Sequence, residues 1–575
     1  MTQTPFARVS QPTQFRDLYS DTWVATDALG RSLPVGAQVR APQPDKTAAM
    51  FYYLWQQDGP VVSDITKALA ANPKDPQFGG PTSFHWWGEP EAGYFNASDP
   101  WVIRRNLSML SDAGIDVIFF DVTNALTYLN SVKAVGDVSR QMRAEGSVTP
   151  QIAFLTNARG GRTQTELYEK FYSQNLYPEL WYRLDGKPFL LGAPDAKMDD
   201  GSEMSDEVKN YFSRRQSWAW SNPDGWYGDG KGKWPWLDNT PQNPGYSPDG
   251  KLEQIVVETA QHPTTNKGKS FHDNKQPPVN QYGIAKETPL GLHFAEQWKR
   301  ALEVDPPLVF ITQWNEWIAQ RFVVDDQRKS GLMGRALEPG ESFFVDVYNA
   351  EYNRDIEPMK GGWTDNYYYQ MVAGLREFKG ARPIPVASAA RTMAMNGNVA
   401  AWNAVGPEYR DTIGDTLHRD FRGWTEDLIY KNDSGRNDIL SSKVARDARN
   451  IYFHVETQDK LTPRTDSNWM MLFVDADNNP RSGWHGYDVR VSGGNGNIEV
   501  WRDGKWQWAG RAKTVVGEKF LDVTLPRQYI TRTGIDLTFD FKWVDNADAN
   551  DISAWFVNGD TAPNRRFNYR YLARP

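Results

Sequence analysis

The sequence predicts an α/β fold in which a (β/α)8 TIM-type barrel, residues 46–380, is followed by an all-β sandwich, residues 401–575. Between residue 48 and about residue 380, short apolar runs alternate with helical stretches, which is typical of βα units on a parallel sheet. No glycine-rich phosphate fingerprint follows the first apolar run, which disfavours a doubly wound sheet. Beyond residue 400, short alternating strands broken by Gly, Asn and Asp replace the helical pattern, which favours a sandwich.

Two further segments complete the predicted organisation. A chain of 575 residues is too long for a single core, so two or three domains are expected. Residues 1–45 are polar and rich in Pro and Gly, and we expect an arm that lies over the first domain. Residues 381–400, which include Pro383 and Pro385, are expected to form a linker.

The barrel prediction rests on eight apolar runs. One helix between them is well marked, because Asp99 and Pro100 form an N-cap with Pro at the first helical position, and apolar residues then recur at 3–4 spacing through residue 113. Further helices are expected at 294–303 and 366–378. The eight predicted strands are 48–55, 114–121, 151–157, 187–192, 216–220, 254–259, 308–313 and 343–349.

The sandwich prediction rests on six shorter runs with alternating polarity. Turn-forming residues separate them, and helical periodicity is nearly absent. The predicted strands are 450–455, 469–474, 487–492, 498–502, 520–524 and 537–543.

A carboxylate follows the seventh predicted barrel strand. Residues 309–317 read Val-Phe-Ile-Thr-Gln-Trp-Asn-Glu-Trp, which places Glu316 at the carboxyl end of a buried strand, where barrel enzymes hold their catalytic groups. Glycoside cleavage needs two carboxyl groups across the scissile bond, and Glu258 and Asp121 end two other predicted strands. The alternative is that each of these carboxylates is a buried structural group satisfied by local hydrogen bonds.

The 24 Trp residues are an unusually large number, and they favour surfaces that stack on sugar rings. Two segments concentrate aromatic residues: 84–94, and 218–236, which contains five Trp. The alternative for both is a folded aromatic loop that binds no sugar. Glu351 and Asp355 follow the eighth predicted strand, and the alternative for them is an ion-pair network around Arg354. The predicted substrate-binding residues are Trp55, His85, Trp86, Trp87, Asn157, Trp218, Trp220, Trp314, Asn315, Trp317 and Glu351.

The second domain contains a candidate calcium loop. Asp475, Asp477 and Asn479 alternate before Gly483, and hard oxygen ligands at this spacing suit calcium. The loop is not an EF-hand, because Gly486 occupies the twelfth position; Asp488 is the nearest acidic residue. An Asx-rich turn is the alternative interpretation. No cofactor is expected for catalysis, since the chain has no Cys and no zinc, Walker or nucleophile-elbow motif.

The bulk properties limit the partners. The formal net charge is −8 and there is no long basic run, so nucleic acid is not expected as a partner. No apolar stretch approaches the length of a membrane span. The first residues lack a signal peptide pattern, so the protein is either cytosolic or exported with its signal removed. The absence of Cys suits an exported bacterial protein, and we expect a periplasmic or secreted location. The oligomeric state is not predicted.

Several segments together resemble glycoside hydrolase family 99 and its family 71-like relatives. These segments are Phe-Tyr-Tyr-Leu-Trp at 51–55, and the stretches 94–105, 113–121, 180–189 and 313–317. The resemblance implies a barrel enzyme that cuts α-linked mannose or glucose polymers internally, often without a metal. The C-terminal domain is similar to family 9 carbohydrate-binding modules, in which an Asp-x-Asp loop and exposed Trp residues recur.

The sequence departs from the family 99 pattern at one position. In that family a second catalytic Glu follows the first by three positions; Glu316 matches the first, but residue 319 is Ala. The partner of Glu316 therefore does not carry over from the resemblance, and Glu258 is the first choice and Asp121 the second.

We therefore predict a glycoside hydrolase that acts on a plant, algal or microbial polysaccharide or oligosaccharide through two carboxylates. The alternatives are a non-catalytic polysaccharide-binding protein with a decayed barrel, and a polysaccharide lyase or glycosyltransferase on the same barrel. A transferase would need a phosphate-binding loop, which the sequence lacks.

Overall fold

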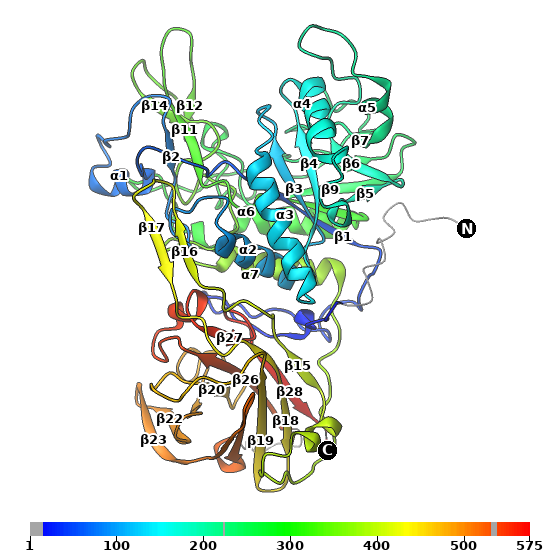
Figure 1. The fold of residues 1–575 in the computed structure, drawn as a ribbon. Coiled ribbons are helices and arrows are strands. Elements are labelled where there is room, and N and C mark those ends of the chain that lie inside the picture. The colour runs from blue at the N-terminus through cyan, green and yellow to red at the C-terminus, as the bar shows by residue number, and fades with distance from the viewer. Residues whose placement is uncertain (1–14, 222–224, 531–536, 575) are drawn as a thin grey trace.

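The computed structural model describes residues 15–221, 225–530 and 537–574. Its upper part in Figure 1 combines helices with a parallel sheet, and its lower part is built from antiparallel strands. The predicted change of pattern near residue 400 is therefore confirmed as a change from mixed α/β to all-β structure.

Seven parallel strands form the central sheet of the α/β part. Their order is β7-β6-β4-β3-β1-β10-β9, and a short antiparallel strand, β8 (Gly245–Tyr246), pairs with β9. The inner strands are apolar and buried on both faces, as expected for a sheet covered by helices. Their bounds are β1 (Thr47–Tyr52), β3 (Val117–Val122), β4 (Gln151–Thr156), β6 (Lys187–Leu191), β7 (Ser213–Arg215), β9 (Leu252–Glu258) and β10 (Leu308–Thr312).

Six of the eight predicted barrel strands lie in this sheet, and the other two need correction. The fifth strand is β7, which ends before residue 216; Gln216 and Ala219 beyond it make only single parallel bridges with Lys233 and Leu237. The sheet is curled. Between its strands β7 and β9, isolated bridges take the place of a continuous ladder of hydrogen bonds.

The predicted eighth strand, 343–349, is wrong. Only its first two residues, Phe343 and Phe344, lie in a strand, β14 (Ser342–Phe344), which pairs antiparallel with β11 (Ile318–Val323). The other edge of β11 pairs with β2 (Phe84–Trp86), so these strands form a separate small sheet. Local apolar pattern predicts an extended conformation but does not select the partner strand. The part of the chain that carries β11 and β14 forms a projection (Figure 1). It also contains β12 (Gly331–Leu332) and β13 (Arg335–Ala336).

Helices cover the parallel sheet. The predicted cap of α2 is confirmed, because the Asp99 side chain accepts from Trp101 N at 3.0 Å and Gly114 ends the helix at φ 90°. The α-helices are α1 (Ile65–Ala71), α2 (Pro100–Ala113), α3 (Leu129–Ala144), α4 (Gly160–Leu167), α5 (Asp206–Tyr211), α6 (Leu292–Val304) and α7 (Asn366–Lys379). Short 3-10 segments are Ser20–Thr22, Pro178–Leu180, Pro263–Thr265, Thr288–Leu290, Val399–Ala404, Arg527–Tyr529 and Ile552–Phe556, and Tyr168–Tyr172 is a π-helical turn.

Two antiparallel sheets form the C-terminal part. Phe453 of one sheet packs against Phe539 and Phe541 of the other, with ring centroids 5.8 and 5.5 Å apart. The first sheet has the order β15 (Glu408–Arg410), β18 (Ile439–Arg446), β19 (Asn450–Thr457), β25 (Phe520–Pro526), β24 (Lys513–Val516). The second has the order β23 (Lys505–Arg511), β22 (Asn497–Arg502), β21 (Val489–Ser492), β20 (Met471–Asp475), β26 (Leu537–Asp545), β27 (Asp560–Ala562), with β28 (Tyr569–Ala573) also on β26. A two-residue strand, β5 (Arg183–Leu184), pairs with β6 in the α/β part.

The two parts are tied together by a hairpin and by the arm. The hairpin β16 (Arg419–Arg422)–β17 (Ile429–Asn432) rises from the sandwich beside the α/β part (Figure 1). Arg419 Nε donates to Asp99 Oδ2 at 2.7 Å, and Trp424 packs edge-on against Trp86 at 5.7 Å. The arm was expected to lie over the first domain alone, but Val24 also bridges Asn568 of the sandwich.

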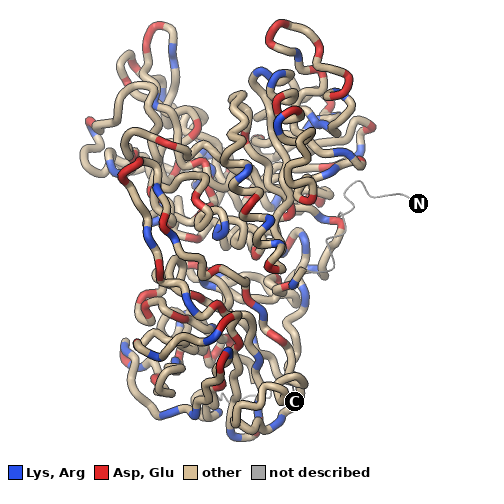
Figure 2. The backbone as a smooth tube through the Cα atoms, viewed as in Figure 1, with Lys and Arg blue, Asp and Glu red and all other residues tan. Residues whose placement is uncertain are grey.

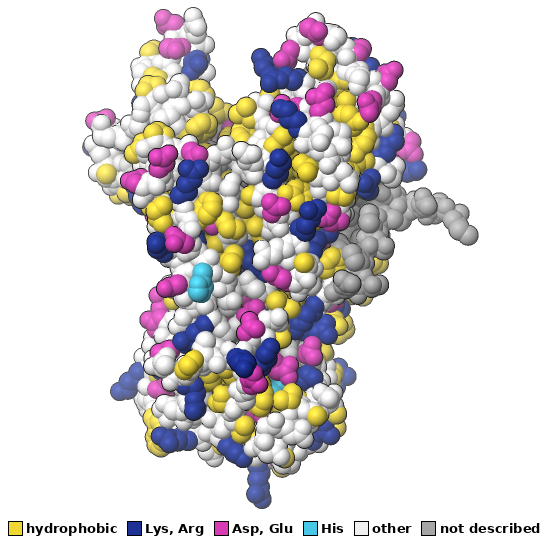
Figure 3. Space-filling model, viewed as in Figure 1, with side chains coloured by type: hydrophobic (Ala, Val, Ile, Leu, Met, Phe, Trp, Pro, Cys, Tyr) yellow, Lys and Arg dark blue, Asp and Glu magenta, His cyan; other side chains and the backbone are white. Residues whose placement is uncertain are grey.

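The surface carries both charges. Figure 2 shows Lys and Arg interspersed with Asp and Glu over both parts of the chain. Figure 3 shows a broad notch at the top of the molecule, between the projection that carries β11 and β14 and the lobe that carries α4 and α5. Among the described residues, no helix combines the length and apolar character that crossing a bilayer requires.

Candidate active site

The segment that follows β10 is fixed to the neighbouring strand β1 by Asn315. Its side-chain Oδ1 accepts from Tyr53 N at 2.8 Å, and its Nδ2 donates to Tyr53 O at 3.2 Å. Gln56 Nε2 also donates to Asn315 O at 2.7 Å. Both polar atoms of this buried amide are therefore used to position the strand ends, and Asn315 is a positioning residue in this structure.

Four of the Trp residues predicted to bind substrate are fully buried. Trp87 stacks on Trp317 with centroids 4.6 Å apart, and on Trp363 at 5.1 Å. Trp86 and Trp314 have no exposed surface. Because protein atoms occupy their faces, these four residues, Trp86, Trp87, Trp314 and Trp317, are core and not sugar-stacking platforms.

His85 is also removed from the substrate-binding set. Its side chain is 1% exposed, and its Nε2 accepts from Gly79 N at 2.8 Å. Its ring packs against Phe78 and Phe344. These contacts hold the loop that precedes β2 against β14.

Glu316 is buried, and the chain binds one of its two oxygens. Arg354 Nη2 donates to Glu316 Oε2 at 2.6 Å, and Gln313 Nε2 donates to the same oxygen. Asp355 Oδ1 accepts from Glu316 N and fixes the backbone. The other oxygen, Oε1, accepts no hydrogen bond from the described part of the chain. Burial raises the pKa of Glu316 well above its ordinary value, although Arg354 opposes the shift.

Arg354 connects Glu316 with a carboxylate that the sequence analysis missed. Its Nε donates to Gln313 Oε1 at 2.5 Å, and its Nη1 donates to Gln261 O at 2.8 Å. Its Nη2 also lies 3.6 Å from Asp346 Oδ1, and the Asp346 side chain is 36% exposed. Asp346 lies two residues after β14. The only feature of the local sequence that marks it is that an acid follows a short apolar run.

Asp121 ends β3 beside the same site. The register pairs Tyr52 with Phe120, which puts Tyr53 next to Asp121 across the strands. Thr123 N donates to Asp121 Oδ1 at 2.8 Å. Burial raises the pKa of Asp121 to about 6, and the bonds from Thr123 limit the shift. The pKa of the Tyr53 hydroxyl is raised by burial, then by Glu316 and Asp121, which places all three groups in one electrostatic cluster.

Glu258, the first choice as partner, has different neighbours. It is fully buried, His293 Nε2 lies 3.0 Å from its Oε1, and Asp238 N donates to its Oε2 at 3.1 Å. Burial raises its pKa. Since the chain binds both oxygens, Glu258 braces the end of β9 in this structure.

Glu351 has a similar structural role. It is fully buried, and its Oε1 accepts from Ser270 N at 3.0 Å and from Gln276 Nε2 at 2.8 Å. Thr288 donates to its other oxygen. Glu351 therefore holds the long loop between β9 and α6.

A pocket opens at the carboxyl ends of β4, β6 and β7. Trp218 is 38% exposed and its ring lies 6.3 Å from that of Trp236, which in turn lies 5.8 Å from the Arg354 guanidinium. The pocket is thus linked to the Glu316 cluster through Trp236. Its lining residues are Thr156, Asn157, Gly160, Ala193, Gln216, Ser217, Trp218 and Trp226.

Two other predicted stacking residues keep some exposure. Trp55 is partly buried and lies 5.2 Å from Tyr53. Trp220 is also partly buried, and its Nε1 donates to Gln261 Oε1 at 3.1 Å. Both lie next to residues of the Glu316 cluster or its supports.

The predicted calcium loop brings Asp475 and Asp477 together with a third acid, Asp488. Carboxylate oxygens of these three residues lie within 4.8 Å of one another. Asn479 Oδ1 accepts from Arg481 N at 3.1 Å. Asp475 Oδ1 accepts from Asp477 N and Asn479 N, which is the arrangement of an Asx turn.

Comparisons with known proteins give a distant structural likeness. The chain matches no family profile and no curated protein. It is similar to two solved structures of the GH99 endo-α-mannosidase from Bacteroides thetaiotaomicron. The one in complex with bis-tris-propane has a TM-score of 0.32 and 17% identity, over 58% of this chain and 97% of that chain. The other has a TM-score of 0.33 and 19% identity, over 58% and 98%.

Proposed function

We propose that the protein is a glycoside hydrolase whose active site is the cluster of Glu316, Asp121 and Tyr53 around Arg354. The observation that carries this proposal is the asymmetric binding of Glu316. Arg354 and Gln313 hold Oε2, while no residue in the described part of the chain donates to Oε1. A buried carboxyl with one oriented, unused oxygen at the carboxyl end of a parallel strand suits general acid catalysis.

In the proposed reaction, Glu316 carries its proton on Oε1 and gives it to the glycosidic oxygen as the C–O bond breaks. Burial raises the pKa of Glu316, which favours the protonated form that this role needs. Asp121, with a pKa of about 6, is ionised there. It either takes a proton from the attacking water or attacks the anomeric carbon itself, and the anomer released distinguishes these two routes.

Asp346 is the alternative partner. Its Oδ1 lies 3.6 Å from Arg354 Nη2, and Glu316 Oε2 lies 2.6 Å from the same nitrogen. The two carboxylates are therefore close neighbours. It also adds to the negative potential that raises the pKa of Glu316. Asp121 is preferred because its pKa is close to the pH at which a general base works best.

The proposed substrate is a polysaccharide. Trp218, Trp55 and Trp220 offer partly exposed indoles near the cluster. In the sandwich, Trp508 is 68% exposed, which supports a carbohydrate-binding role for this domain. We also propose that the curled sheet is a barrel of the (β/α)8 type, closed by the bridges of residues 216–219 with residues 233–237. Two further proposals are that Asp475, Asp477 and Asp488 bind calcium and that the protein is exported.

The test is a polysaccharide panel with product analysis. Wild type, Glu316→Gln, Asp121→Asn and Asp346→Asn are compared, and Glu258→Gln serves as the buried control. We expect cleavage by wild type and a loss of at least about a hundredfold in Glu316→Gln and Asp121→Asn. Glu258→Gln should retain activity once its folding is verified by circular dichroism. Cleavage by Glu316→Gln at the wild-type rate contradicts the site assignment.

One observation favours a second candidate, a polysaccharide-binding protein without activity. Ala319, at the position of the second family Glu, lies in β11 opposite His85 and is 3% exposed, so no carboxylate occupies that place. This function predicts that no glycan is cut, while the protein is retained on an insoluble polysaccharide and Trp218→Ala weakens that retention.

A further inference from the structure

A second acidic cluster lies under the α/β part, far along the chain from Glu316. Asp411 and Asp415 belong to the loop between β15 and β16, and Asp560 begins β27. Carboxylate oxygens of these three residues lie within 4.8 Å of one another. Two ligands of one calcium ion are separated by up to about 5 Å, since each lies 2.3–2.6 Å from the ion.

Four of the six carboxylate oxygens in this cluster lack donors among the described residues, and Asp560 Oδ2 accepts from Ile439 N at 2.7 Å. Asp411 is fully buried, and neither of its carboxylate oxygens has a hydrogen-bond partner among the described residues. Oδ1 of Asp415 and Oδ1 of Asp560 are buried and unpartnered in the same way. Buried carboxylates without donors are costly, and they are normally paired or coordinate a metal.

The positive groups nearby do not satisfy these oxygens. Among the described residues, no basic side chain lies within 4 Å of the three carboxylates. Lys542 is the buried cation that faces Asp411 and Asp560, but its Nζ donates to Pro563 O, and burial lowers its pKa to about 7. Arg104, which faces Asp415, donates instead to Glu145 and to Ile413 O.

The surrounding acids increase the negative charge. Asp112 of α2 faces both Asp411 and Asp415, and Asp438 faces Asp415 and Asp560. Both carboxylate oxygens of Asp438 accept from Gly414 N, so Asp438 orders the loop. Its own charge adds to the negative charge of the cluster. Burial and mutual repulsion raise the pKa values of Asp411, Asp415 and Asp560.

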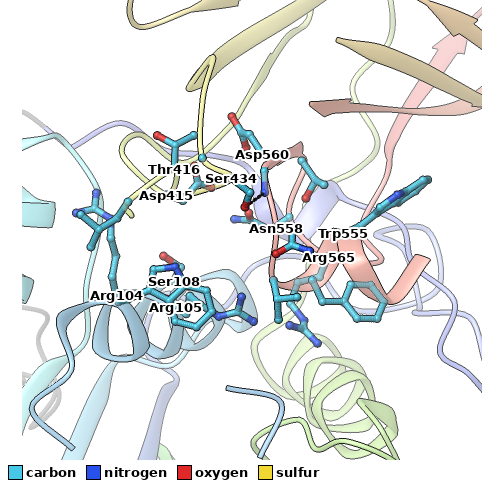
Figure 4. A pocket seen from close by; sticks show the side chains of 18 of the residues that line it. Arg104, Arg105, Ser108, Asp415, Thr416, Ser434, Trp555, Asn558, Asp560 and Arg565 are labelled. Carbon is cyan, nitrogen blue, oxygen red and sulfur yellow. Dashed lines mark hydrogen bonds between the residues drawn. The ribbon is translucent and has the colours of Figure 1, made fainter. Parts of the chain in front are cut away.

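An external ion has a route to this cluster. A narrow cavity lies between α2 and the sandwich, and Asp415 and Asp560 line it. Figure 4 shows these two acids on the sandwich side of the cavity and Arg104, Arg105 and Ser108 on the helix side. The cluster is therefore reached from the junction of the two parts.

We propose that Asp411, Asp415 and Asp560 bind a divalent cation, calcium by its preference for flexible all-oxygen sites, and that this ion stabilises the junction between the α/β part and the sandwich. The bound ion supplies the charge that the chain does not provide. This site is separate from the Asp475 loop, where backbone N–H groups donate to the carboxylates.

The test measures metal content and thermal stability of the full chain. Wild type, Asp411→Asn and Asp560→Asn are stripped with EDTA, dialysed against calcium and analysed by mass spectrometry of the metal; Asp475→Asn is the matched control. We expect Asp411→Asn and Asp560→Asn each to bind one equivalent fewer than wild type. Asp475→Asn should lose only the separate equivalent of its own loop, and the double variant Asp411→Asn/Asp475→Asn should lose both. Equal calcium content in wild type and Asp411→Asn overturns the proposal.

Measurements on wild type alone keep the proposal testable if the variants do not fold. EDTA should lower the Tm by about 3 °C or more, and calcium should restore it. Terbium bound at the site should be excited through Trp101 and Trp555, which line the cavity, and calcium should displace it. A wild-type protein that binds no calcium and no terbium, with a Tm unaffected by EDTA, overturns the proposal. Restoration by magnesium and not by calcium would overturn the choice of metal.

Discussion

The cluster around Glu316 and the cluster around Asp411 are both buried groups of carboxylates, but their oxygens have different neighbours. Glu316 Oε2 is held by Arg354 and Gln313, so the chain supplies the counter-charge, and no described residue donates to Oε1. Both oxygens of Asp411 lack any donor among the described residues. Burial alone therefore does not define a site. An internal cation orients a buried carboxyl group, whereas buried carboxylates without one are neutralised by a proton or by a bound ion.

The largest expected effect comes from removing the internal cation. Arg354→Leu leaves three buried acceptors, Glu316 Oε2, Gln313 Oε1 and Gln261 O, without their donor, and we expect a loss of at least about 3 kcal/mol in the free energy of unfolding. Urea denaturation measures this loss. The matched control is Arg140→Leu, because Arg140 forms an exposed ion pair with Glu179 that contributes about 0–1 kcal/mol. Equal losses in the two variants would contradict the structural role of Arg354.

The second prediction concerns the pH dependence of kcat/KM. Activity requires Asp121 ionised and Glu316 protonated, so it should rise about tenfold per pH unit below pH 6 and level off above it. It should fall again only at a pH above the ordinary range of a carboxyl group, where Glu316 loses its proton. Asp346→Asn removes a negative charge that raises the pKa of Glu316, so it should move this alkaline limb to lower pH. An unchanged limb would show that Glu316 is not the acid.

The third prediction sharpens the contrast between the clusters. Asp411→Asn removes one unpaired charge, so in EDTA we expect its Tm to be about 2–4 °C above that of wild type. In calcium the order should reverse, because only wild type keeps the complete site. Differential scanning calorimetry under both conditions checks the crossover, and parallel curves with no reversal would contradict it.

The smallest expected effect is at the pocket. Trp218→Ala should raise KM about 2- to 15-fold with little change in kcat, since stacking on a sugar contributes about 0.5–1.5 kcal/mol. Trp508→Ala, on the sandwich, is the control and should leave KM for short oligosaccharides unchanged. A fall in kcat without a change in KM would assign Trp218 to a different role.

Much of the fold followed from local sequence pattern. Six parallel strands, the capped helix α2 and the change to antiparallel strands were predictable because apolar periodicity and caps act within a few residues. The run 343–349 failed because β14 and a barrel strand have the same local pattern and differ only in their partner.

The sequence by itself determined which carboxylates end strands, since Glu316, Asp121 and Glu258 each follow or end an apolar run. Only the tertiary structure decided their roles. Arg354, 38 residues from Glu316, orients it, whereas His293 and Asp238 occupy Glu258, and Asp346 and the Asp411 cluster had no signal that singled them out. The physical reason is that the pKa and availability of a buried carboxylate depend on donors brought from distant segments, which no local pattern records.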